Sequence, residues 1–179
     1  MTPPARYSST AIFLHWLVAA LVIGNFALGW YMHELPLSPA KLRYYSYHKW
    51  VGVTVWAVVL IRVAWRLSHP VPPLPPGTPK WQVHAASFSH LALYALTLVI
   101  PISGWMMSSA AGFRVVYFGL LPLPDLVPKN EAWFEYLRAV HEYFNWALLT
   151  LVLVHVAAAL KHHYFDADDV LKRMLPRFR

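Results

Sequence analysis

The chain has 179 residues, of which 58% are hydrophobic and only 13% are charged, and its formal net charge is +7. Because a soluble domain of ordinary composition carries about a quarter charged residues, these values predict an integral membrane protein. Cysteine is absent, which excludes disulfides, thiolate-bound iron–sulfur clusters and covalent haem attachment through a C-x-x-C-H motif.

Two apolar stretches in the first half of the chain are long enough to cross a bilayer as helices. The first is expected over residues 10–32. It is too long for the apolar part of a signal peptide and no cleavage pattern follows it, so we expect it to be retained. Ser38-Pro39 predicts an N-cap followed by a proline at the first helical position, which opens a second helix over residues 39–67.

Two further spans are expected in the second half. Thr78-Pro79 repeats the cap-and-proline pattern and opens a third helix over residues 79–107. After a loop that contains three prolines, Asn130 is expected to cap a fourth helix over residues 131–163. The predicted fold is an all-α membrane protein, a bundle of four transmembrane helices, in which residues 1–179 form a single domain.

Basic residues near the ends of the spans predict the orientation of the bundle. One side carries nine of them: Arg6, Arg62, Arg66, Lys80, Lys161, Lys172, Arg173, Arg177 and Arg179. The other side carries six: Lys41, Arg43, Lys49, Arg114, Lys129 and Arg138. The side with nine is expected to be cytoplasmic, so both termini are expected there. This placement at the span ends is explained by a membrane surface and does not indicate nucleic-acid binding.

Four histidines lie inside the apolar stretches: His15, His48, His141 and His155. An ionisable residue at membrane depth indicates a functional site by default. His141 and His155 are fourteen residues apart on one predicted helix, so they share a face and lie about 21 Å apart along its axis. By depth, His48 matches His141 near the outer side, and His15 matches His155 near the inner side. The spacing predicts two histidine pairs stacked across the membrane, as in an electron carrier with two haems.

Two other interpretations of these histidines exist. A lone histidine in a transmembrane helix often serves only as a hydrogen-bonding member of a helix interface, although four at matched depths are harder to explain in that way. A metal-ion transporter would need carboxylate and histidine ligands that converge at one depth. Glu142 is the only acidic residue in the membrane-depth stretches, which makes the transporter interpretation weak.

Short motifs in each span resemble those of the bacterial cytochrome b561 family, over nearly the whole chain from about Arg6 to Pro176. They are F-L-H-W-L in the first span, H-K-W-V-G and R-V-A-W-R in the second, S-H-L-A-L-Y and P-I-S-G-W in the third, and H-V-A-A-A-L-K-H-H-Y-F in the fourth. The resemblance implies a multi-pass cytochrome of the bacterial inner membrane with two b-type haems as cofactors. It places the iron ligands at His15, His48, His141 and His155, in the same two pairs.

The resemblance also implies partners. Members of the family are associated with electron exchange with ubiquinone, and some with oxidation of superoxide from the periplasmic side. We therefore expect a superoxide:ubiquinone type of oxidoreductase, which moves electrons between a small periplasmic donor and membrane ubiquinone. The alternative is a cytochrome b anchor or relay subunit of a membrane dehydrogenase or hydrogenase complex. The outer loop, only about 22 residues long, favours the first.

Five further residues are candidates for the haem and quinone sites. His162 and His163 close the fourth helix, where interfacial placement is the ordinary role and quinone contact is the functional one; we expect them to be catalytic. His90 lies deep in the third span and is expected to bond a haem propionate or a quinone carbonyl, or else to join two helices. Arg62 and Arg66, one turn apart, are expected to pair with haem propionates, the alternative being a role in orientation.

Overall fold

The computed structural model describes residues 6–176 and contains four long helices. They are α1 (Ser9–Glu34), α2 (Pro39–Ser68), α3 (Lys80–Ala110) and α4 (Glu131–Tyr164). Each is long and apolar enough to cross a membrane, so the prediction of an all-α membrane protein with four spans is confirmed. The four spans begin and end within about three residues of the predicted bounds.

Three of the helices begin at capping side chains. Ser8, Ser38 and Asn130 accept hydrogen bonds from the backbone N–H groups of the first turns of α1, α2 and α4. The predicted cap at Thr78 is wrong. Its hydroxyl donates instead to the carbonyl of Pro75 at 2.7 Å, and α3 begins only at Lys80. Thr78 closes a turn in the proline-rich connector between α2 and α3, residues 69–79. This turn uses the hydroxyl that would otherwise cap the helix.

The loop between α3 and α4 contains a short hairpin that the sequence did not predict. Strand β1 (Val116–Tyr117) pairs in antiparallel fashion with β2 (Leu121–Pro122). Gly119 in the connecting turn has φ of +72°, a value that favours glycine. The hairpin is fixed to α2, because Trp50 donates to the carbonyl of Val116 at 2.6 Å. Strands of two residues are too short to leave a periodic pattern in the sequence.

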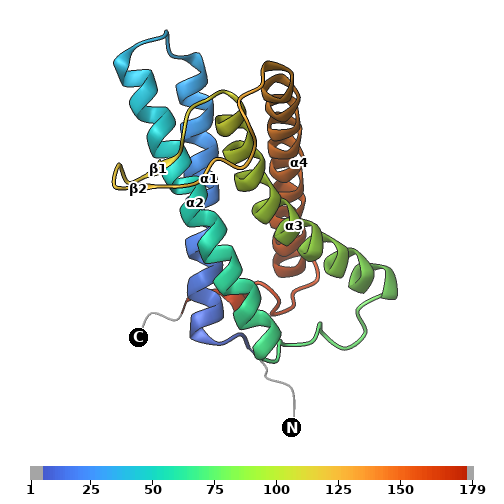
Figure 1. Ribbon diagram of the computed structural model, residues 1–179. Helices are drawn as coiled ribbons and strands as arrows, with labels where there is room; N and C mark the ends of the chain where they lie inside the picture. The colour runs from blue at the N-terminus through green and yellow to red at the C-terminus, as the bar shows by residue number, and fades with distance from the viewer. Residues whose placement is uncertain (1–5, 177–179) are drawn as a thin grey trace.

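The helices run up and down, and the closest backbone packing follows chain order, α1 on α2, α2 on α3 and α3 on α4. Figure 1 shows that the α1–α2 and α3–α4 connections lie at one end of the bundle, which we call the hairpin end. The start of α1, the end of α4 and the α2–α3 connection lie at the other, which we call the terminal end. Arg177 and Arg179, two of the nine basic residues used to predict orientation, lie outside the described residues.

The apolar side chains divide between a small core and an outer surface. Val18, Val55 and Val59 form a buried cluster between α1 and α2. Many large apolar side chains along the helices are exposed, among them Phe13, Phe88, Leu91 and Leu153, each more than 60% accessible. In a helix long enough to span a bilayer, such side chains face lipid tails and not water. Lipid contact is therefore expected around the whole bundle.

The segment after α4, residues 166–176, folds back across the terminal end, and we call it the tail. It contains one turn of 3-10 helix, Lys172–Met174. Trp16 of α1 donates to the carbonyl of Met174 at 2.8 Å, and Arg173 donates to the carbonyl of Pro73 in the α2–α3 connection at 2.5 Å. The tail therefore ties α1 to the proline-rich connector at the terminal end.

Candidate functional site

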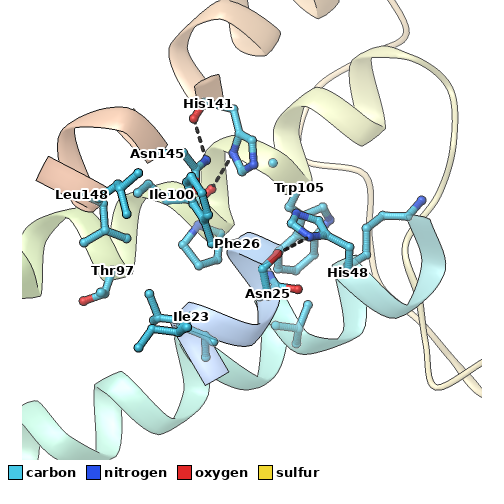
Figure 2. A pocket seen from close by; sticks show the side chains of 18 of the residues that line it. Ile23, Asn25, Phe26, His48, Thr97, Ile100, Trp105, His141, Asn145 and Leu148 are labelled. Carbon is cyan, nitrogen blue, oxygen red and sulfur yellow. Dashed lines mark hydrogen bonds between the residues drawn. The ribbon is translucent and has the colours of Figure 1, made fainter. Parts of the chain in front are cut away.

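His48 of α2 and His141 of α4 face each other at the hairpin end. Their ring centres are 6.3 Å apart and the ring planes are nearly perpendicular, at 83°. Both line a space of about 950 Å³, part of it open to the surroundings, which all four helices and Val115 of the loop enclose. Figure 2 shows the two imidazoles pointing into this space from opposite walls. The structure thus brings together two histidines that are 93 residues apart in the chain.

Hydrogen bonds orient both of these rings. Nδ1 of His48 lies 3.2 Å from the backbone oxygen of Asn25, and Nδ1 of His141 lies 3.1 Å from the backbone oxygen of Ile100 (Figure 2). A carbonyl oxygen can only accept, so each Nδ1 carries the proton. Each Nε2 therefore keeps its lone pair, which is the form of histidine that binds a metal. No sequence pattern pointed to these two carbonyl groups.

Two glycines on neighbouring helices leave room for these rings. A Cβ atom on Gly104 of α3 would lie 2.9 Å from Cε1 of His141, and one on Gly29 of α1 would lie 3.1 Å from Cε1 of His48. Real Cβ atoms essentially never show the first of these distances, and the second is tighter than nine in ten of their contacts. Both glycines are therefore part of the site. Sequence analysis did not assign either glycine to the site, because small residues at helix crossings usually serve close packing.

His15 of α1 and His155 of α4 form the second pair, at the terminal end. Their ring centres are also 6.3 Å apart, with the planes at 61°. His90 of α3 joins them, with its ring centre 5.5 Å from that of His155. Trp16 packs edge-on against His15 at 5.2 Å. The Nδ1 atom of His15 is buried and has no hydrogen-bond partner among the described residues. Three histidines thus converge where sequence depth had paired only two.

Arg62 and Arg66 lie beside this cluster. Arg62 donates to the hydroxyl of Tyr94 at 3.1 Å, and its guanidinium lies 5.4 Å from the centre of that ring. Together with Met174 of the tail, these residues line a smaller space of about 410 Å³. Among residues 6–176, neither arginine forms a salt bridge with a carboxylate. Two cations without acidic partners are suited to bind an anionic group.

His162 and His163 have different surroundings. Nδ1 of His162 lies 2.6 Å from a carboxylate oxygen of Asp168 in the tail and 3.2 Å from one of Asp166. Because a carboxylate accepts, Nδ1 donates and Nε2 is left unprotonated in the neutral ring. Nδ1 of His163 is buried without a partner in the described chain. Sequence analysis missed the two aspartates, which gave no signal because they lie in a segment without periodicity.

The sequence itself supplies the class of cofactor. The model of the family described as prokaryotic cytochrome b561 matches residues 6–177. The chain belongs to the prokaryotic cytochrome b561 family. This confirms the resemblance inferred from the span motifs, and membership implies b-type haem and a multi-pass place in the inner membrane.

Three relatives of this b561 chain are similar over nearly their full length. Cytochrome b561 homolog 2 of Escherichia coli is 38% identical, with 96% of this chain and 92% of the relative covered. Cytochrome b561 homolog 1 of the same organism is 31% identical, with 96% and 98% covered. A protein of Yersinia pestis named probable superoxide oxidase CybB is 29% identical, with 97% and 98% covered.

The histidine pairs of this cytochrome fit b-type haem. Metal–imidazole bonds of about 2.0–2.1 Å, with each bonding nitrogen roughly 1.2 Å from its ring centre, place two ring centres about 6.4 Å apart. Both pairs measure 6.3 Å. Both pairs fit in ligand type and spacing, and the hairpin-end pair also lines a space that all four helices border. The assignment of all four as iron ligands stays a prediction.

Proposed function

We propose that this cytochrome carries electrons across the membrane through two b-type haems, from a one-electron donor in the periplasm to ubiquinone. The observation that supports it most is the presence of two facing histidine pairs at opposite ends of one bundle. When bound, each haem supplies an iron centre that accepts and releases single electrons. The protein's contribution is to hold the two groups in series along the bundle.

In this proposal, His48 and His141 hold one haem and His15 and His155 hold the other. Arg62 and Arg66 are placed to bind the propionates of the terminal-end haem, because they lack acidic partners within residues 6–176 and lie in electrostatic reach of that cluster. His90 extends the same cluster and offers a further hydrogen bond to a propionate or to a quinone oxygen.

The hairpin end is proposed to face the periplasm. It carries six basic side chains and five acidic ones, Glu34, Asp125, Glu131, Glu135 and Glu142, for a net charge of +1. The terminal end carries seven basic side chains among the described residues, and Arg177 and Arg179 follow them in the sequence. The larger number of Lys and Arg residues on this side, nine against six in the sequence, supports cytoplasmic termini. A reporter fused after residue 179 should be cytoplasmic, and a tag in the hairpin loop should be periplasmic.

The same charges limit how an anionic donor such as superoxide would be attracted. With a net charge of only +1, the hairpin end produces little long-range steering. Arg138 is paired with Glu135 at 2.6 Å, and Arg114 with Asp125 at 3.3 Å. Lys49 is the basic residue that lines the space between His48 and His141, where its amine donates to Ser108 at 3.1 Å. Attraction of an anion is therefore proposed to act locally, through Lys49.

Ubiquinone is proposed to react at the terminal end, with His162 and His163 as the catalytic residues. Reduction of a quinone takes up two protons, and histidine can relay protons near neutral pH. Asp168 fixes the ring of His162 through Nδ1, which leaves Nε2 free to exchange a proton with a bound quinone. Asp168 is thus a positioning residue in this proposal, since it acts through His162.

The experiment that tests the proposal begins with a pyridine haemochrome assay on the purified protein, which should give two b-type haems per chain. His48→Ala combined with His141→Ala should remove one haem, and His15→Ala combined with His155→Ala the other, because an untethered haem that loses both nitrogen ligands is bound weakly. Retention of both haems in either double variant would overturn the assignment.

A second measurement separates the oxidoreductase from a relay subunit. The purified protein alone, loaded with haem, should reduce a quinone analogue when superoxide is generated outside proteoliposomes. The name of the Yersinia pestis relative supports this activity. A protein that binds two haems but transfers no electrons from superoxide would favour the alternative of an anchor or relay subunit in a dehydrogenase or hydrogenase complex.

A further inference from the structure

The two histidine pairs differ in the hydrogen bonds that their rings make. At the hairpin end both rings donate through Nδ1, to the backbone oxygens of Asn25 and Ile100. At the terminal end Nδ1 of His15 is buried without a partner, and no hydrogen bond is made by His155 within the described part of the chain. Bonds to the outer nitrogen of a metal-binding histidine fix the ring and raise its basicity. The difference therefore bears on the electronic properties of the two sites.

Ser103 adds a third interaction at the hairpin end. Its Oγ lies 3.0 Å from Nδ1 of His141 and donates its own proton to the carbonyl of Ile100 at 2.8 Å. The proton on Nδ1 of His141 is therefore shared between two acceptors, a hydroxyl and a backbone oxygen. Ser103 is only 5% exposed, so its hydroxyl is largely shielded from water.

A serine inside a helix commonly bonds the backbone one turn before it, and this alone would be an ordinary structural role. The contact with His141 is different, because it joins α3 to α4 across the bundle. Gly104 follows directly and leaves the space into which the ring fits. Ser103 and Gly104 together thus determine where the imidazole lies and which of its nitrogens faces His48.

We propose that Ser103 is a positioning residue that keeps the Nδ1 proton of His141 partly shared and so makes His141 a more electron-rich ligand. This inference rests on the proposed ligation of the hairpin-end haem by His141. An electron-rich ligand stabilises the oxidised iron and lowers the reduction potential of that haem. Removing the hydroxyl raises that potential and leaves the terminal-end haem unaffected.

The test is a spectroelectrochemical titration of the purified protein with both haems bound. In Ser103→Ala the ratio of reduced to oxidised hairpin-end haem should rise about fivefold at a fixed ambient potential, the effect of one ordinary hydrogen bond. Since tenfold corresponds to 59 mV for one electron, this is a shift of about 41 mV. Ser103→Thr keeps the hydroxyl and should restore the parent potential.

Ser109→Ala is the matched control. Ser109 is a buried serine on the same helix, but its hydroxyl donates to the carbonyl of Trp105 and does not contact a histidine. The proposal is overturned if neither potential moves in Ser103→Ala, if both move equally, or if Ser109→Ala produces the same shift. If Ser103→Ala does not retain haem, Ser103→Cys decides, because its weaker acceptor should give a smaller shift in the same direction. Fewer than two haems in the parent protein would instead refute the proposed function.

Discussion

Replacing Gly104 by alanine is expected to remove the hairpin-end haem and leave the terminal-end haem in place. Gly104 lies on α3 directly against the imidazole of His141. Alanine normally favours a helix over glycine by about 1 kcal/mol, so an effect on the haem would come from the space that the new methyl group occupies and not from weakening of α3.

The size of the disturbance follows from the structure. The added Cβ would lie 2.9 Å from Cε1 of His141, which is 0.5 Å inside the 3.4 Å at which ordinary contact begins, so the ring or the helix must shift by a few tenths of an ångström. Its Nδ1 is already held by bonds of 3.0 Å to Ser103 and 3.1 Å to Ile100. Overpacking of this kind lowers stability by about 1–3 kcal/mol. The displaced ring of His141 would also no longer point directly at His48.

The assay is haem content per chain by pyridine haemochrome, together with the reduced absorption spectrum of the membrane-extracted protein. Gly24→Ala is the matched control, because nothing lies within 4 Å of a Cβ atom at that position in α1. Gly29→Ala should be intermediate, since its Cβ would lie 3.1 Å from Cε1 of His48. Haem loss is expected to be smallest in Gly24→Ala, larger in Gly29→Ala and largest in Gly104→Ala. Full occupancy by two haems with an unchanged spectrum in Gly104→Ala would refute the reasoning.

The remaining predictions concern the two reaction faces and the tail. His162→Ala should slow quinone reduction while both haems stay bound and reducible by superoxide; an unchanged quinone rate would remove His162 from the mechanism. Lys49→Met should lower the second-order rate with superoxide severalfold at low salt, whereas Arg138→Gln should change it little because that cation is already neutralised; equal effects would contradict local attraction. A hydrogen bond from Arg173 holds the pKa of Asp169 below its usual value of 3.8, so the tail should gain a small stabilisation above that pH and lose it as the pH falls through the lowered pKa. Proteolysis of the tail should accordingly increase only in acid, and Asp169→Asn should remove this dependence.

Hydropathy and helix-end patterns determined most of the fold. The composition, the four apolar stretches and the side chains of Ser38 and Asn130 were sufficient to predict four spans and two of their starting points, because the bilayer fixes helix length and capping is a local interaction. Thr78 shows where local reasoning failed, since a turn in the connector used the hydroxyl that the helix could have used. The hairpin of residues 116–122 was missed because its strands are too short to show a sequence pattern. A hydrogen bond from Trp50 of α2 fixes it in place, and that contact cannot be read from the sequence.

The same division holds at the site. Residue spacing along α4 and depth within the spans were sufficient to pair His48 with His141 and His15 with His155, because a straight helix converts sequence separation into height. Spacing along one helix carries no information about what a different helix presents at that height. Only the tertiary structure decided that Ser103, Gly104 and the carbonyl of Ile100 surround His141, and that Asp168 of the tail meets His162. Those contacts set the proton position and the room around each ring, and they arise where separate helices cross.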